Sequence, residues 1–73
     1  MPPVPSLSAK DILDALQRAG FVIMRQNGSH IILQRKSTHR TAVVPRHNPV
    51  SKGTLRSIIR QADMTVEEFL LLL

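Results

Sequence analysis

The sequence contains no cysteine, no tryptophan and no tyrosine. Without cysteine, disulfide bonds are excluded and the usual cysteine-based zinc sites are not expected. A chain of 73 residues forms one domain, and a core of this size leaves a stability margin of only about 3–5 kcal/mol. The stability must therefore come from compact apolar packing or be shared with a partner.

Aromatic side chains are limited to Phe21 and Phe69. RNA-recognition motifs and OB-folds bind single strands by stacking bases on aromatic side chains, so neither class is expected. Carboxylates, which hold Mg²⁺ in metal-dependent nucleases, are missing from the whole segment 25–60. We therefore expect no metal and no cofactor.

Long hydrophobic runs are also missing. The C-terminal "FLLLL" holds five apolar residues, whereas a membrane span needs about 20, so we expect a helix end that packs on the core. The N-terminal "MPPVPSLS" has no basic region followed by an apolar run, and it is not a signal peptide. We expect an extended leader over residues 1–7 and a cytoplasmic protein.

Charge is abundant but segregated. The net charge is +5, and we call residues 25–60 the basic stretch because it holds eight cations and all three histidines, whereas the five acids lie outside it. The cations are Arg25, Arg35, Lys36, Arg40, Arg46, Lys52, Arg56 and Arg60. A surface segregated in this way attracts polyanions, above all nucleic acid. The alternative is a basic face that is merely solvated.

A helix is predicted at about residues 8–19. Ser8 can cap its start, and Asp11 suits the positive end of the helix dipole. Apolar residues at helical spacing, Ile12 and Leu16 among them, give it one apolar side. Gly20 is a natural stop.

Two apolar runs then flank "NG" and predict a β-hairpin. Asn27-Gly28 suits a type I′ turn, which needs positive φ at both central positions. With that loop, Gln26 pairs with Ser29 and Arg25 pairs with His30. Arg25 and His30 would then share a sheet face with Phe21, Ile23 and Ile32; periodicity does not show which face meets the helices.

The rest of the chain predicts one more strand and two more helices. "TAVVP" (41–45) reads as a strand ended by Pro45, which cannot donate to a ladder. A second helix follows Ser51 and buries one face, made of Leu55, Ile58, Ile59 and Ala62. Thr65 and Glu68 form a capping box for a short helix at 66–72. The order αβββα predicts a single α+β domain over residues 8–73, with three antiparallel strands and the helices on one face.

One hydrolytic route survives these exclusions, namely cleavage of RNA, which carries its own nucleophile in the 2′-OH. Such an enzyme needs a general base or acid and cations for the phosphate. His30 suits the first task because histidine titrates near neutral pH. Arg25 can orient the phosphate opposite His30. The alternatives are that Arg25 and His30 only form a cross-strand surface pair, and that His30 is a hairpin residue with no catalytic role.

Further phosphate contacts are expected along the second helix and the loop before it. Lys52, Arg56 and Arg60 recur every fourth residue and can follow an RNA backbone, or they can form a solvated helix face. His47, next to Arg46, is a candidate second proton donor or phosphate contact.

Three segments together resemble the HicA family of toxins, which are mRNA interferases. They are "GFVIMRQNGSHIILQR", "VVPRHN" and "KGTLRSIIRQADMTVEEFL", and the resemblance covers about residues 8–72. It implies a fold like that of double-stranded-RNA-binding domains and a toxin that cleaves mRNA and stops translation. It also implies that His30 is the catalytic histidine and that a HicB-like antitoxin masks the active site.

The expected site therefore has a catalytic and an RNA-binding part. His30 acts as general acid or base, and the RNA-binding residues are Arg25, Gly28, Ser29, Arg46, His47, Lys52 and Arg56. Asp63 departs from the family pattern, which has glycine after Gln-Ala, and this puts the end of the second helix in doubt. A non-catalytic double-stranded-RNA-binding module and a domain that binds an acidic protein are the alternatives; oligomerisation with the antitoxin stays open.

Overall fold

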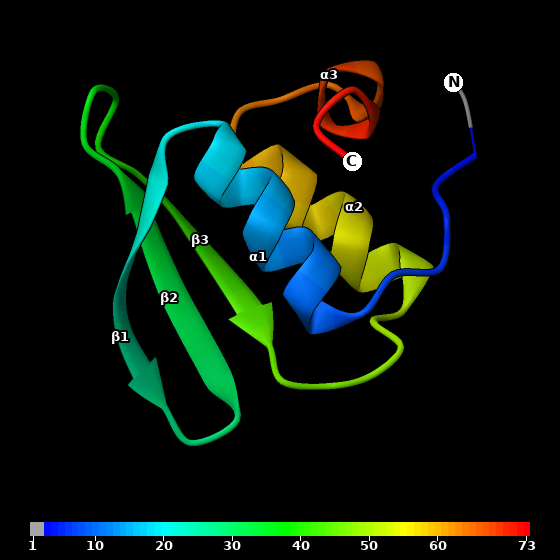
Figure 1. The fold of residues 1–73 in the computed structure, drawn as a ribbon, viewed down its shortest axis with the longest axis horizontal. Helices are drawn as coiled ribbons and strands as arrows, with labels where there is room; N and C mark the ends of the chain where they lie inside the picture. Colours follow the sequence, from blue (N-terminus) through cyan, green and yellow to red (C-terminus); the bar gives the residue numbers. More distant parts are fainter. Residues whose placement is uncertain (1–2) are drawn as a thin grey trace.

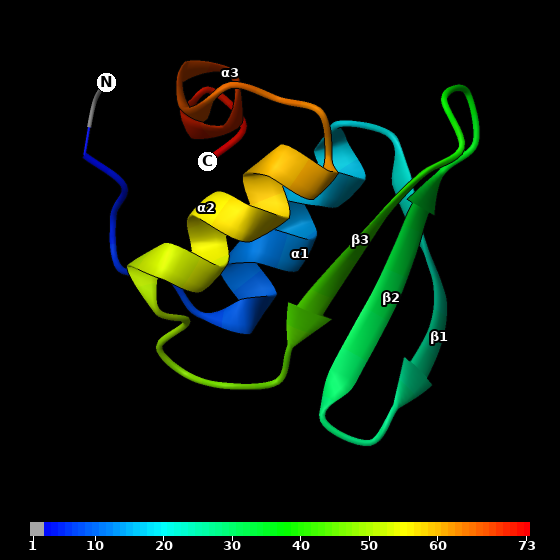
Figure 2. The same cartoon turned by 180° about the vertical axis from the view of Figure 1, so that it is seen from behind.

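The fold places three helices on one side of a three-stranded antiparallel sheet. The computed structural model describes residues 3–73. Its elements in chain order are α1 (Ala9–Arg18), β1 (Phe21–Asn27), β2 (His30–Arg35), β3 (Arg40–Pro45), α2 (Lys52–Gln61) and α3 (Val66–Leu70). The sheet order is β1-β2-β3, and Figures 1 and 2 show α1 and α2 on the same side of the sheet. The predicted αβββα order and α+β class are confirmed.

The helix ends follow local capping chemistry. The Ser8 hydroxyl accepts from the Asp11 amide, and the Asp11 carboxylate accepts in turn from the Ser8 amide, so α1 begins with a full capping box. Thr65 and Glu68 build the same arrangement at α3, and Ser51 caps α2. These side chains satisfy amide groups that the first helical turn leaves unpaired.

The predicted hairpin turn is wrong by one residue, and the pairing of the two strands is therefore shifted by two. Asn27, not Arg25, lies opposite His30, so Gly28 and Ser29 form the two-residue loop. Gly28 has φ +59, whereas neither Asn27 nor Ser29 has positive φ. A type I′ turn needs positive φ at both loop positions, while a type II′ turn needs glycine only at the first. Gly28 satisfies the second geometry, and Asn27 stays in the strand.

A β-bulge at Met24 corrects the prediction for the start of β1. The register shifts between Ile23 and Arg25, and one extra residue reverses which side chains face the helices. Phe21 therefore lies on the inner face and is buried, although we expected it beside His30. Ile23 moves with it and pairs with Leu33, whereas Arg25 pairs with Ile32 and does share the outer face with His30.

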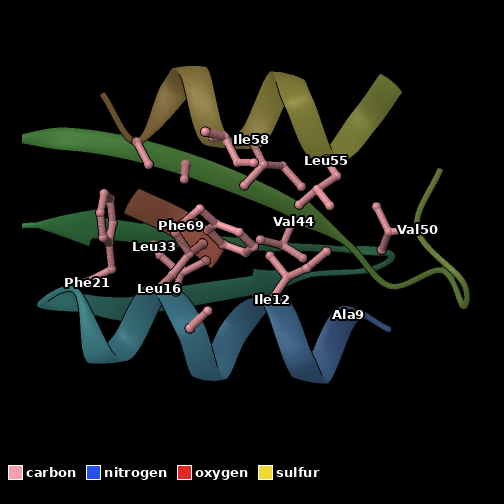
Figure 3. Packing of buried hydrophobic residues seen from close by; sticks show 14 of the residues in the cluster. Ala9, Ile12, Leu16, Phe21, Leu33, Val44, Val50, Leu55, Ile58 and Phe69 are labelled. Atoms are coloured by element: carbon pink, nitrogen blue, oxygen red, sulfur yellow. The ribbon is translucent and has the colours of Figure 1, made fainter. Parts of the chain in front are cut away.

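The core is entirely apolar within the described chain. It lies between the inner face of the sheet and the helices, and no polar or charged residue among 3–73 is buried. Figure 3 shows Leu33 and Val44 from the sheet meeting Ile12, Leu16 and Leu55 from the helices. Phe69 of α3 is fully buried among them. Each such side chain contributes about 1.5–3 kcal/mol on burial.

The segment before α1 also contributes to the packing. Val4 belongs to the core cluster and is 2% exposed. The Val50 amide donates to the Leu7 carbonyl at 2.8 Å, which ties the segment to the loop before α2. The first two residues of the expected leader lie outside the described residues, and the proposed boundary at residue 8 stays a prediction.

The end of α2 shows the consequence of the Asp63 departure. Asp63 takes φ +60, in the left-handed region, where non-glycine residues are strained by about 1–2 kcal/mol and aspartate less than most. Its carboxylate lies 3.9 Å from the Arg40 guanidinium, and both groups are largely exposed. An ion pair of this kind adds little.

We expect Asp63→Gly to raise the free energy of unfolding by about 0.5–1 kcal/mol, or roughly 2–8 °C in Tm, because glycine adopts positive φ without strain. Chemical denaturation followed by circular dichroism measures this. Asp63→Asn is the control, since it removes the charge but keeps tolerance for the left-handed region. A loss of stability in Asp63→Gly would show that the ion pair with Arg40 outweighs the backbone strain.

Candidate nucleic-acid interface

His30 lies at the end of the sheet on its outer face. It is the first residue of β2, it is exposed, and it stands between Asn27 of β1 and Pro45 of β3 in the register. The core occupies the opposite face. The imidazole is therefore accessible to a large substrate without any opening of the fold.

The neighbouring hydroxyl can set the tautomer of the histidine. Ser29 Oγ lies 3.4 Å from His30 Nδ1. When Nδ1 carries the ring proton it donates to this hydroxyl, and Nε2 then keeps a free lone pair. This is the tautomer that a general base requires.

The loop after β3 is fastened to the hairpin beside His30. The Arg46 amide donates to the Ser29 carbonyl at 2.6 Å, and the Arg46 guanidinium donates to Gln26 Oε1. Both bonds join segments that are far apart in the sequence. They hold the guanidinium at the same end of the sheet as His30.

Two more predicted residues complete the group at this end, which we call the hairpin site (Arg25, Gly28, Ser29, His30 and Arg46). Arg25 is exposed on the His30 face, two residue pairs further along the sheet. Among residues 3–73 the ion pairs are Lys10–Asp14 and Arg40–Asp63, so Arg25 is not neutralised there. No atom lies within 4 Å of the place where a side chain on Gly28 would start, so a phosphate can approach the turn closely.

The remaining predicted residues lie beyond the hairpin site. His47 is in the β3–α2 loop, where its amide donates to the Pro45 carbonyl. Lys52 is the first residue of α2. Arg56, one turn later, borders a hollow of about 320 Å³ between α2 and α3. Figure 1 shows the start of α2 across the molecule from the β1–β2 turn, so Lys52 lies at a distance from the hairpin site. His47, by contrast, lies two residues after Pro45, the β3 partner of His30.

Part of the basic stretch serves the fold. The Arg40 guanidinium donates to the Arg60 carbonyl at 3.4 Å, at the C-terminal end of α2. A cation there complements the negative end of the helix dipole. Arg40 therefore counts in the net charge but lies at the opposite end of β3 from the hairpin site.

Sequence reasoning overlooked Gln26 and Asn48. Gln26 accepts from Arg46, and Asn48 Oδ1 accepts from the Ala9 amide at 2.8 Å. The partners are 20 and 39 residues away in the chain. A local pattern cannot predict such contacts, because they exist only once the chain has folded.

Two further properties of the described chain concern metal-ligand clusters and membrane-spanning helices. Within residues 3–73, no three side chains of His, Cys, Asp or Glu gather as metal ligands would. No helix in this same part of the chain is long and apolar enough to cross a membrane.

Comparison with known families shows which family this chain belongs to. The family model of the HicA toxin of bacterial toxin–antitoxin systems matches residues 9–64, from the start of α1 to just beyond α2. The chain belongs to the HicA toxin family. It is thus the toxin of a toxin–antitoxin pair, whose partner is an antitoxin. No curated protein matches the sequence.

This HicA toxin should depend on Gln26 to hold its β3–α2 loop against the hairpin. We expect Gln26→Ala to speed amide hydrogen exchange at Arg46 by about 2–10-fold, because the loop loses one of its two bonds to the hairpin. Exchange followed by NMR measures this. Gln34→Ala, on the outer face near the other end of β2, is the control and should leave Arg46 unchanged. Equal exchange in all three proteins would mean that the backbone bond alone holds the loop.

Proposed function

We propose that this HicA toxin is a metal-independent endoribonuclease that cleaves mRNA and thereby inhibits translation. The observation that carries the proposal is the exposed His30 at the end of the sheet, with Ser29 at its Nδ1, Arg25 on the same face and Arg46 bonded to the same hairpin. Histidine and cations are the groups that cleavage through the 2′-OH requires.

In the proposed reaction, the 2′-oxygen of one nucleotide attacks the adjacent phosphorus and the bond to the 5′-oxygen of the next nucleotide breaks. His30 accepts the 2′-OH proton through Nε2 as base, or donates a proton to the departing 5′-oxygen as acid. The products are a 2′,3′-cyclic phosphate and a free 5′-hydroxyl, and the proton count balances. DNA lacks the nucleophile and should stay intact.

The other residues of the hairpin site would bind the scissile phosphate. Arg25 lies on the same face as His30 and can donate two parallel hydrogen bonds to phosphate oxygens. Arg46 adds charge from the other side of the turn, and the open backbone at Gly28 and Ser29 allows close approach. Lys52, Arg56 and His47 would hold the RNA further along its backbone.

The antitoxin partner is proposed to be HicB-like and to cover the hairpin site, in the cytoplasm. The exposed outer face and the positive charge favour an acidic partner surface. Addition of such an antitoxin should abolish RNA binding and cleavage together. Cleavage that persists in the complex would exclude masking of the active site.

We expect His30→Ala to retain the fold and to lower the rate of RNA cleavage by about 10²–10⁴-fold, because general acid–base catalysis contributes that much. A long mRNA incubated in EDTA with each protein, and resolved on a gel, measures the rate. His39→Asn is the matched control: His39 lies in the β2–β3 turn with φ +59, which asparagine tolerates, and it should cleave like the unaltered protein.

Two results would contradict the proposal in different ways. Equal cleavage by His30→Ala would remove His30 from the chemistry. Intact RNA with every protein, together with a clear shift on a native gel, would favour the non-catalytic RNA-binding module.

A further inference from the structure

A hollow of about 280 Å³ lies next to the hairpin site, on the other side of the sheet end from the His30 ring. Its walls come from α1, β2 and the β3–α2 loop, and the lining residues are Ala9, Lys10, Leu13, Ile31, Arg46 and Asn48. Ile31 directly follows His30, and Arg46 is bonded to the Ser29 carbonyl. The hollow and the proposed catalytic histidine thus share the same few residues of backbone.

The hollow suits one flat heterocycle. Its volume is just below the usual range for small-molecule pockets, and its lining combines the apolar side chains of Leu13 and Ile31 with the polar side chains of Lys10, Arg46 and Asn48. The only two aromatic residues, Phe21 and Phe69, are buried. A base next to the scissile phosphate therefore cannot stack on a phenylalanine ring, and the aliphatic side chains of Leu13 and Ile31 offer it an apolar surface instead.

The polar rim is made of hydrogen-bond donors. Asn48 uses its Oδ1 to accept from the Ala9 amide, and this bond leaves the amide Nδ2 as its donor. The Arg46 guanidinium is also a donor-only group. Lys10 already donates to Asp14 at 2.8 Å, and this hydrogen bond raises the pKa of Lys10. No lining residue is a carboxylate.

We propose that this hollow is a nucleobase pocket that selects keto bases, uracil and guanine, at the nucleotide flanking the scissile phosphate. Donors at the rim bind the carbonyl oxygens of these bases, whereas the exocyclic amino groups of cytosine and adenine would face donors and lose a hydrogen bond. This inference rests on the proposed ribonuclease activity, because its first test measures where the RNA is cleaved. It adds the class of base that the site recognises.

Asn48→Asp isolates the rim donor. The carboxylate keeps an acceptor for the Ala9 amide but has no N–H to offer a base. We expect the unaltered protein to cleave next to uracil over cytosine, and next to guanine over adenine, by roughly 3–10-fold, the value of one hydrogen bond. Asn48→Asp should bring both ratios close to 1. The added carboxylate repels every RNA site to the same extent. A ratio of cleavage rates at two sites within one RNA is therefore unaffected by this repulsion.

Leu13→Phe fills the hollow without a change of charge. We expect it to remove the same preferences, whereas Gln17→Phe, which adds the same ring one turn further along α1 and outside the hollow, should keep them. Sequencing of all cleavage ends in a single mixed-sequence RNA gives the ratios for every protein. Unchanged ratios in both Asn48→Asp and Leu13→Phe would overturn the nucleobase pocket.

A second readout does not depend on cleavage. His30→Ala protein is titrated with hexamers of uridine and of cytidine, and amide shifts are followed by NMR. The inference expects larger shifts for uridine at Leu13, Ile31 and Asn48. Shifts confined to Arg25, Ile32 and Val43 on the outer face would overturn it even if the toxin cleaves RNA. Shifts at the hollow without any cleavage by the unaltered protein would sustain the pocket and contradict the ribonuclease proposal instead.

Discussion

The rest of the structure depends on the burial of one sheet face under α1 and α2. No disulfide is available, and every buried residue of the described chain is apolar. Strand residues alternate between the two faces, so the demand that Ile31 and Leu33 point inward forces His30 and Ile32 outward. The accessibility of the histidine follows from the packing of its neighbours.

The hairpin site adds polar contacts to this apolar frame. Arg46 bonds to Ser29 and Gln26, and Asn48 bonds to the first turn of α1. These bonds join the β1–β2 hairpin, the β3–α2 loop and the start of α1 at one end of the sheet. A cleavage site and a base pocket there would share this support, and a substrate would meet a surface that needs little rearrangement before chemistry.

The positive charge has several uses in this small toxin. Arg25 lies on the His30 face and Arg46 is bonded to the same hairpin, while Arg40 stabilises the end of α2 through the Arg60 carbonyl. Net charge predicted a polyanion partner, which stays a prediction, while the family membership shows a toxin that pairs with an antitoxin. Charge alone could not show which arginines face a substrate, because that depends on where the strands end.

The sequence by itself determined the element order, the helix caps and the apolar faces, because these depend on residues three or four apart or on strict alternation. It also identified His30 as the candidate catalyst, by chemistry and by resemblance. Only the tertiary structure decided the pairing of β1, in which the turn falls at Gly28 and Ser29 and a separate bulge at Met24 places Phe21 on the buried face under the helices. The same holds for Gln26 and Asn48: their partners lie far away in the chain, and only the packing of α1 and the β3–α2 loop against the sheet brings them within hydrogen-bond distance.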